Sequence, residues 1–566
     1  MGVNGFILNS RIADESRNTA PLRRCIGSVL LGAVGTITLM AQDLRVPHSA
    51  DWPMFGQNAS NTASNSVESA ISTKTVASLK TKWTFTTGGD VSARAAVVNK
   101  VAYFPDWAGN LWAVNTENGD LLWSHQFSDY GLTAGTVSRT TPAVADGILY
   151  TGTQYVAPAT TTAPQPATGW LLAIDARSGK LIWKIQPDTS NPFPVITGSP
   201  VVAFGIVYVG MTSHEEFAAA ETPGYKCCSV RSSVVAVDAA FGYPIWQTFT
   251  VPTGYTGGSV WGSNPVVDLS RGTVFVGTGN NYSVPTDPDY LACAEKGGTE
   301  AACLSPDDHA DSILALDMFN GQVKWATRFM TWNQAGVISG SDSWNVSCAF
   351  GVAPGVGNCP GESGASPAGS GPDFDFGSAP NEITYRSGSG IKTIIGAGQK
   401  SGIYYALDPD TGAELWRTQV GPGSSLGGME WGSATDGTNI YVAISNHYGL
   451  SYAAGSAGSF AALDPATGAI VWQRADPNGA IDLAPMAVAN GVVYAASMAG
   501  SATAPTMLAL NAANGNTLWS FAAGSSVVAG ATIVNGVVYW GSGYSHLGLP
   551  GFTGNTKFYA FSIDGK

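Results

Sequence analysis

Charged side chains are scarce in this chain. Asp, Glu, Lys and Arg make up only 12% of its 566 residues, against about 25% in an average soluble protein. The 40 acidic residues outnumber the 27 basic ones, which gives a formal net charge of −13. Phosphate backbones and anionic membrane surfaces repel such a chain. We therefore expect no nucleic-acid partner.

Residues that usually bind zinc, haem or dinucleotides are also sparse. The six His include no pair spaced for zinc, and the one dense cluster is His214 beside Glu215 and Glu216. No Cys-x-x-Cys-His sequence occurs, so covalently attached haem is not expected. No Gly-rich phosphate loop opens a helix after a strand, which argues against a nicotinamide-dependent enzyme.

The N-terminal segment predicts export. Arg23 and Arg24 precede a mostly apolar run at residues 25–41. This is the pattern of a signal peptide, which would span residues 1–41 and leave 42–566 as the mature domain. Gly and Thr residues interrupt the run, so it would cross a membrane poorly. A membrane anchor that is not cleaved is the alternative to a signal peptide. We expect a periplasmic or secreted protein with no membrane span in its mature chain.

The cysteine count agrees with export. Six Cys lie beyond residue 41, and an even number in an exported chain suggests disulfides. The adjacent Cys227 and Cys228 leave two alternatives open, a strained ring disulfide between them or two separate bridges. The natural local pairs are Cys293 with Cys303 and Cys348 with Cys359.

A repeat dominates the rest of the sequence. Gly (70) and aromatic residues (10%) are frequent, as in proteins built of short strands and tight turns. Seven times an Ala is followed by Asp or Asn two residues later, by Gly six later and by Trp ten later. The copies begin at Ala113, Ala173, Ala236, Ala315, Ala406, Ala462 and Ala509, and end at Trp123, Trp183, Trp246, Trp325, Trp416, Trp472 and Trp519.

Each copy has a simple structural interpretation. An alternating apolar strand, as at 171–174, leads into an Asp-led turn, the Gly takes a positive φ, and a second strand follows. A large ring at the same place in every copy predicts a wedge that packs one unit against the next. Further strands upstream, as at 147–151, 205–210, 273–277 and 491–497, bring the count to four per unit. Four-stranded units in an all-β chain are typical of a β-propeller.

The ends of the chain predict how the ring closes. An eighth copy begins at Tyr559 and Ala560, but the chain ends at Lys566, before its Trp. We predict that the segment from Asp51 onward supplies the missing outer strand, which makes an all-β, eight-bladed β-propeller with Trp-docked repeats. The longest intervals between copies contain residues 283–311 and 331–372, and loops of such length are usually functional.

Polar side chains near the predicted blade strands are candidates for a site. Carboxylate and amide oxygens suit a hard cation such as calcium, to which a cofactor could add further ligands. On loops, such residues are more often solvated or cap turns, so the set alone is weak evidence. The candidates are Thr197, Glu215, Asn280, Asp373, Asp375 and Lys400.

With these features together, the sequence resembles the quinoprotein alcohol dehydrogenases over about residues 51–566, most closely the branch that includes polyvinyl-alcohol dehydrogenase. The resemblance implies pyrroloquinoline quinone (PQQ) and Ca²⁺ as cofactors. It depends on the seven Trp repeats together with Asp51-Trp-Pro-Met-Phe-Gly-Gln-Asn58, Gly277-Thr-Gly-Asn280, Gly398-Gln-Lys-Ser-Gly402 and Gly427-Gly-Met-Glu-Trp-Gly432.

The resemblance implies roles for individual residues in cofactor binding. Trp261 stands where the family has the floor of the quinone pocket. Glu215 and Asn280 correspond to calcium ligands, with Glu216 as the alternative if the register shifts by one, and Asp373 would complete the metal site. Cofactor oxygens and carboxylates would be contacted by Arg139 and Thr197, and the quinone carbonyls by Lys400.

The catalytic base in the family is an Asp that precedes the basic residue by somewhat under thirty positions. Asp373 lies 27 residues before Lys400 and is the first candidate. Asp375 is its rival, and Asp342 is a third candidate. The family's Trp-Asp pair is replaced here by Pro372-Asp373.

The resemblance thus implies a PQQ- and calcium-dependent oxidation of an alcohol, secondary or polymeric. Calcium would polarise the quinone, the Asp would remove the alcohol proton, and Lys400 would stabilise charge on the reduced quinone. Electrons would leave to an external acceptor such as a separate cytochrome c. Two non-enzymatic alternatives stay open: a propeller scaffold for cell-envelope protein assembly, and a lectin-like propeller that binds sugars or polymers.

Overall fold

The repeats fold as the two outer strands of four-stranded antiparallel sheets. In each copy the Ala lies opposite the Trp, as in the pairs Ala113 with Trp123 and Ala462 with Trp472. A register shift follows the Ala directly. The Asp between them closes the turn, since the Asp175 carboxylate accepts the backbone N–H of Ser178 at 2.7 Å. The predicted strand–turn–strand unit is confirmed.

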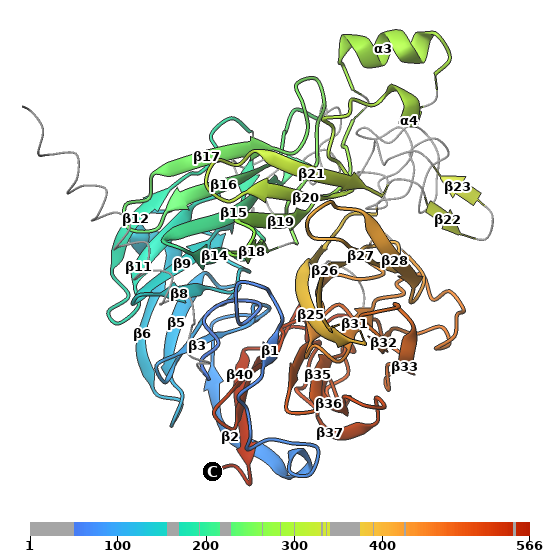
Figure 1. Ribbon diagram of the computed structural model, residues 1–566. Coiled ribbons are helices and arrows are strands. Elements are labelled where there is room, and N and C mark those ends of the chain that lie inside the picture. The colour runs from blue at the N-terminus through green and yellow to red at the C-terminus, as the bar shows by residue number, and fades with distance from the viewer. Residues whose placement is uncertain are drawn as a thin grey trace, which may run out of the picture. The chain divides into compact units, whose positions relative to one another are not determined.

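The structure is a computed structural model, shown in Figure 1. It describes residues 50–155, 169–191, 193–215, 228–262, 264–283, 285–298, 300–329, 332–334, 337–339, 374–388, 390–423, 426–546 and 551–566. The export segment 1–41 therefore lies outside the described residues. Among the described residues, no helix is long and apolar enough to cross a membrane.

Eight sheets of this kind follow one another along the chain. The first four are β3–β6 (Ala96–Val98, Val101–Pro105, Asn110–Asn115, Leu121–Gln126), β8, β9, β11 and β12 (Ala143–Ala145, Ile148–Gly152, Leu171–Asp175, Leu181–Ile185), β14–β17 (Val201–Ala203, Ile206–Ser213, Ser233–Asp238, Pro244–Phe249) and β18–β21 (Val266–Asp268, Thr273–Gly277, Ser312–Asp317, Val323–Arg328).

The last four sheets include the one that closes the ring. They are β25–β28 (Asn381–Ser387, Gly390–Gly398, Ile403–Leu407, Glu414–Gln419), β30–β33 (Ala434–Thr435, Ile440–Ile444, Ser459–Leu463, Ile470–Ala475), β34–β37 (Ala487–Ala489, Val492–Ala496, Met507–Asn511, Thr517–Phe521), and β38–β40 (Thr532–Val534, Val537–Gly541, Lys557–Ile563) with β2 (Leu79–Thr86). The predicted all-β, eight-bladed propeller is confirmed.

Closure of the ring is achieved by β2, which pairs antiparallel with β40 at the C-terminus (Figure 1). Trp83 of β2 lies opposite Ala560, as each repeat Trp lies opposite its Ala. The N-terminal segment therefore supplies the outer strand, as predicted, and with it an eighth Trp. A search for the repeat misses Trp83 because it lies at the opposite end of the chain from its Ala.

The repeat Trp are wedges between neighbouring blades. Trp123 donates its Nε1–H to the carbonyl of Ala176 in the next repeat at 3.0 Å, and Trp83 donates in the same way to Thr116 at 3.1 Å. The ring lies against the turn Gly of that repeat, since a Cβ on Gly179 would come within 2.8 Å of the Trp123 ring. Gly179 also has a φ of 71°, so both space and conformation require Gly there.

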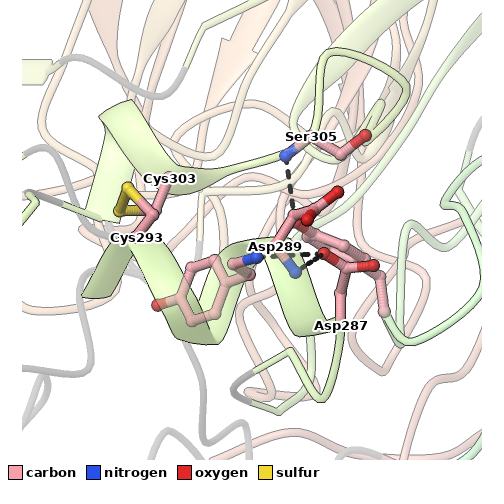
Figure 2. The surroundings of a disulfide bond; sticks show 7 residues. Asp287, Asp289, Cys293, Cys303 and Ser305 are labelled. Atoms are coloured by element: carbon pink, nitrogen blue, oxygen red, sulfur yellow. Dashed lines mark hydrogen bonds between the residues drawn. A yellow bond between two sulfur atoms is a disulfide. The ribbon is translucent and has the colours of Figure 1, made fainter. Parts of the chain in front are cut away.

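The first long insertion carries a small helical substructure. Asp287 begins α3 (Pro288–Glu295), and its carboxylate accepts the N–H groups of Asp289 and Tyr290 at 3.0 Å. A disulfide joins Cys293 of α3 to Cys303 of α4 (Glu300–Cys303), as Figure 2 shows. This pairing is confirmed.

The other predicted disulfides fall wholly or partly outside the described residues. Cys348 and Cys359 lie outside them. Cys228 is disulfide-bonded, whereas Cys227 lies outside, so the relation of these two stays a prediction. The second insertion, 331–372, is described only at the paired strands β22 (Trp332–Gln334) and β23 (Val337–Ser339).

Shorter elements complete the described fold. They are β1 (Ser64–Asn65), which pairs in parallel with β34, the paired β7 (Thr136–Val137) and β10 (Gln154–Tyr155), β13 (Pro194–Val195) on β15, the parallel pair β24 (Ser378–Ala379) and β29 (Trp431–Gly432), and the 3₁₀ turns η1 (Val76–Ser78) and η2 (Phe127–Tyr130).

Candidate active site

The predicted site residues gather at one edge of the blades. Glu215, Asn280 and Lys400 follow the second strands β15, β19 and β26, whereas Thr197, Trp261 and Asp375 lie in connectors that precede innermost strands. In an antiparallel sheet the second strand ends where the innermost strand begins. The topology therefore brings the ends of several blades together, and these side chains with them.

Asp375 is the centre of the contacts at this edge. Its Oδ2 accepts the indole N–H of Trp261 at 2.7 Å and lies 3.2 Å from the ammonium nitrogen of Lys400. Its Oδ1 accepts the backbone N–H of Asn280 at 2.8 Å, and its backbone carbonyl accepts the N–H of Lys400 at 2.9 Å. Asp375 is 4% exposed and Lys400 6%, so this ion pair is buried. Four predicted residues thus form one cluster.

Two glycines allow this close packing. A Cβ on Gly279 would come within 2.6 Å of the Asp375 carboxylate, and one on Gly377 within 3.0 Å of the Trp261 ring. Gly279 belongs to the Gly277-Thr-Gly-Asn280 turn. Its lack of a side chain therefore lets the Asp375 carboxylate reach the N–H of Asn280.

Aromatic rings form a second part of the site. The Lys400 ammonium lies over the Trp261 ring at 4.9 Å, and Trp431 meets Trp261 edge to face at 5.3 Å. The guanidinium of Arg139 lies over the Trp431 ring at 3.9 Å. Thr197 donates its hydroxyl to the backbone carbonyl of Trp261 at 2.7 Å, which fixes the connector that carries this Trp.

Glu215 is buried in a polar cradle of its own. Its carboxylate accepts the N–H groups of Ser229 and Val230 at 2.8–2.9 Å and the hydroxyl of Ser229 at 3.1 Å. Glu215 and Asn280 are each 1% exposed. The carboxylates of Glu215 and Asp375 and the amide of Asn280 are ligand types that suit a hard cation such as calcium. Among the described residues, no group of three His, Cys, Asp or Glu is placed for a metal.

Glu430 is a member of the site that sequence reasoning did not single out. It is 9% exposed, and burial raises the pKa of its carboxyl, while the charges of Lys400 and Arg139 act in the opposite direction. Its position results from the parallel pairing of β24 with β29, which sets residues 378–379 beside 431–432. Glu430 stands in the Gly427–Gly432 motif, but nothing local distinguishes it from a solvated Glu.

Some candidates cannot be placed. Asp373, Asp342 and Glu216 lie outside the described residues. Their roles stay predictions.

A comparison with protein families agrees with the fold. A family model described as outer membrane protein assembly factor BamB matches residues 67–327 and 399–556. The quinohemoprotein alcohol dehydrogenase from Comamonas testosteroni, a solved structure, superposes with a TM-score of 0.64 over 94% of this chain and 82% of its own, at 18% identity. The class is therefore an eight-bladed propeller built of quinoprotein-type repeats.

Proteins related in sequence identify the family within this class. The polyvinylalcohol dehydrogenase from Sphingopyxis sp. (strain 113P3) is 30% identical over 88% of this chain and 74% of its own length, and that from Pseudomonas sp is 30% identical over 93% and 78%. The chain therefore belongs to the repeat family that the matching model describes and to the quinoprotein alcohol dehydrogenases, in the polyvinyl-alcohol dehydrogenase branch, and it is an oxidoreductase.

Proposed function

We propose that this chain oxidises a secondary or polymeric alcohol with PQQ and calcium. The observation that carries the proposal is the Asp375 cluster, a buried carboxylate held by Lys400, Trp261 and Asn280. When bound, the quinone would accept hydride and the calcium would act as a Lewis acid. The type of alcohol is proposed from the relatives, two of which are named polyvinylalcohol dehydrogenases.

The residues that would hold the cofactors are those that the family resemblance names, and their geometry supports this assignment. Trp261 offers a flat ring beside Lys400, whose ammonium would stabilise negative charge on quinone oxygens. Arg139 and Thr197 line a pocket that borders this ring's connector, and they would contact cofactor oxygens. Glu215 and Asn280 would bind the calcium together with an Asp.

Removal of the alcohol proton needs a carboxylate, and two remain candidates. Asp375 is supported by its contacts, because Lys400 and the Asn280 N–H hold its carboxylate in a fixed orientation. Asp373 is supported by its distance in sequence from Lys400. In either case the other Asp would be left to the metal.

Location and electron transfer are proposed from the sequence. The N-terminal pattern supports a periplasmic or secreted protein, and the chain has no haem attachment sequence of its own. We therefore expect the electrons to leave to an external carrier such as a separate cytochrome c.

The test combines binding with turnover. Calorimetry of the purified apo-protein with PQQ and Ca²⁺ should show binding that Glu215→Gln and Asn280→Leu weaken at least tenfold, and that the distant surface variant Glu117→Gln leaves unchanged. A dye-linked assay over primary, secondary and polymeric alcohols then identifies the substrate. No binding of PQQ to the wild-type chain would reject the proposal.

A further inference from the structure

A pair of buried carboxylates lies where the blade β30–β33 meets the blade β34–β37. Asp476 directly follows β33, and Asp482 lies in the connector that leads to β34. Ile444 ends β31, and Gly458 directly precedes β32. The pair therefore lies at the same edge of the blades as the candidate active site, but at other blades, and it includes no residue assigned to PQQ or calcium above.

Asp482 is the more deeply buried of the two carboxylates. It is 1% exposed, and neither of its carboxylate oxygens accepts a hydrogen bond within the described part of the chain. Burial, together with the like charge of Asp476, raises the pKa of the Asp482 carboxyl well above its usual range. A buried carboxylate in this position is costly unless a positive charge or a proton compensates it.

Asp476 is held in a fixed orientation beside Asp482. Its Oδ1 accepts the backbone N–H groups of Asn478 at 2.8 Å and Ala480 at 3.0 Å, whereas its Oδ2 is buried and accepts no N–H group. The two carboxyl groups lie within hydrogen-bonding reach of each other. Three buried carboxylate oxygens, one of Asp476 and two of Asp482, are thus left without an N–H donor. Such groups in native structures usually have a partner, which can be a bound ion.

Further oxygen atoms surround this pair. A Cβ on Gly458 would come within 2.6 Å of the Oδ2 of Asp482 and within 2.7 Å of the carbonyl oxygen of Ile444, so the Gly leaves space between these two oxygens. The phenol of Tyr452 also senses the charge of Asp482, but burial first of all raises its pKa to about 12, so it is neutral at pH 7. Carboxylate and carbonyl oxygens are the ligands of a hard cation such as Ca²⁺ rather than of zinc or copper.

We propose that Asp476 and Asp482 bind one hard divalent cation such as Ca²⁺, with the Ile444 carbonyl and water as further ligands, and that this ion ties the blade β30–β33 to the blade β34–β37. Two carboxylates match the charge of one divalent ion, and Ca²⁺ accepts carboxylate, carbonyl and water oxygens together. A proton shared between the carboxyl groups would cancel only one of their two charges. The site is separate from the calcium proposed at Glu215 and Asn280, and it does not rest on the proposed function.

The experiment uses the purified full-length chain with Glu215→Gln, which removes a ligand of the calcium site proposed above. This parent chain is titrated calorimetrically with CaCl₂ in the absence of PQQ, and its thermal unfolding is recorded in EDTA and in millimolar CaCl₂. Asp482→Asn and Asp476→Asn are then added one at a time. The matched control is Asp188→Asn, since Asp188 is also 1% exposed, but its two carboxylate oxygens accept hydrogen bonds from neighbouring side chains.

We expect the parent chain to bind Ca²⁺ and to unfold at a higher temperature in CaCl₂ than in EDTA. Asp482→Asn and Asp476→Asn should each weaken binding by about tenfold or more and remove this rise, because the number of charged ligands sets the affinity of such sites. The control Asp188→Asn should keep both the binding and the rise. If Asp482→Asn does not fold, Asp476→Asn decides, since its amide oxygen can still accept the two N–H groups that Asp476 accepts.

Two results would overturn the proposal. If the parent chain binds no Ca²⁺, there is no cation site, and a gain in stability of Asp482→Asn in EDTA would then show that the carboxyl pair shares a proton. If Asp482→Asn and Asp476→Asn bind Ca²⁺ as tightly as the parent chain does, the ion is bound elsewhere. Neither result depends on whether the chain binds PQQ, so the proposed function is tested separately.

Discussion

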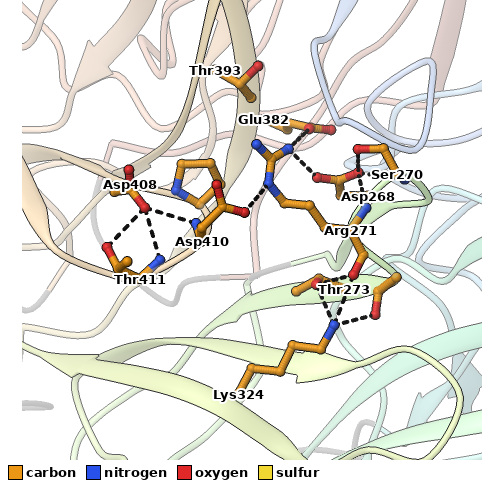
Figure 3. Close-up of polar contacts among 12 residues, drawn as sticks. Asp268, Ser270, Arg271, Thr273, Lys324, Glu382, Thr393, Asp408, Asp410 and Thr411 are labelled. Carbon is orange, nitrogen blue, oxygen red and sulfur yellow. Dashed lines mark hydrogen bonds and ion pairs between the residues drawn. The ribbon is translucent and has the colours of Figure 1, made fainter.

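Two ionic clusters join the same pair of neighbouring blades, β18–β21 and β25–β28. One is the Asp375 cluster, at the connectors that precede β18 and β25. The other surrounds Arg271, in the turn after β18 (Figure 3). Arg271 lies 2.7 Å from Asp268, 2.7 Å from Asp410 and 3.7 Å from Glu382.

The two clusters differ in what surrounds the charges. At Arg271 one cation meets three carboxylates, and Ser60 of the N-terminal segment covers Glu382 with a 2.7 Å hydrogen bond. At Asp375 one carboxylate accepts hydrogen bonds from an indole and a backbone N–H and pairs with an ammonium. A pocket lined by Arg94 and Arg139 lies beside it. Ionic contacts thus tie the blades together at Arg271, and at Asp375 they hold the carboxylate that we propose to act on the substrate or the metal.

The largest expected difference between the two clusters is in their effect on turnover. We expect Asp375→Asn to lower kcat about 10³-fold in the dye-linked assay, the size typical of a lost general base. The free energy of unfolding should also fall, because the Lys400 ammonium is left buried without its carboxylate, so turnover is measured at a temperature at which the variant is folded. Asp373→Asn is the companion variant. Loss of turnover in Asp373→Asn alone, with Asp375→Asn active, would assign the base to Asp373.

At Arg271 we expect an effect on stability alone. Arg271→Met leaves three carboxylates together without their cation, so we expect the free energy of unfolding to fall by about 2 kcal/mol. The affinity for PQQ should not change. Arg417→Met is the control, since its pair with Glu414 is much more exposed and should contribute less than about 0.5 kcal/mol. A loss of PQQ affinity in Arg271→Met would break the distinction between the two clusters.

Titration of the Arg271 cluster should be visible in stability. Burial, with the nearby Asp268 charge, raises the pKa of Glu382 to about 7. The native state therefore keeps a proton that the unfolded state has lost above about pH 4.5, so stability falls as the pH rises through 4.5 to 7. Glu382→Gln does not titrate and should be about 1 kcal/mol more stable than the wild type at pH 8. Parallel urea midpoints for both proteins from pH 4.5 to 8 would contradict this.

The sequence predicts the blades better than it predicts the two ionic clusters. The blades are predictable because each Ala, Gly and Trp reports a local turn and a wedge, and only Trp83 escapes, since closure joins distant ends of the chain. Asp375 and Lys400 are found through family resemblance. Glu430 is not, because its significance depends on which connectors meet at this edge of the blades, and no local pattern records that. The Arg271 cluster is missed for the same reason.

The smallest expected effect is on stability, at Asp410, the exposed member of the Arg271 cluster. Asp410 is 66% exposed in its side chain, yet its hydrogen bond is the largest cause of the raised pKa of Arg271. Solvent and salt screen such a pair, so Asp410→Asn should lower the free energy of unfolding by less than about 0.5 kcal/mol, and the difference should vanish in 1 M NaCl. Urea unfolding at low and high salt measures it. A larger, salt-independent loss would mean that the cluster extends to the surface and that its interior carboxylates depend on Asp410 to position the guanidinium.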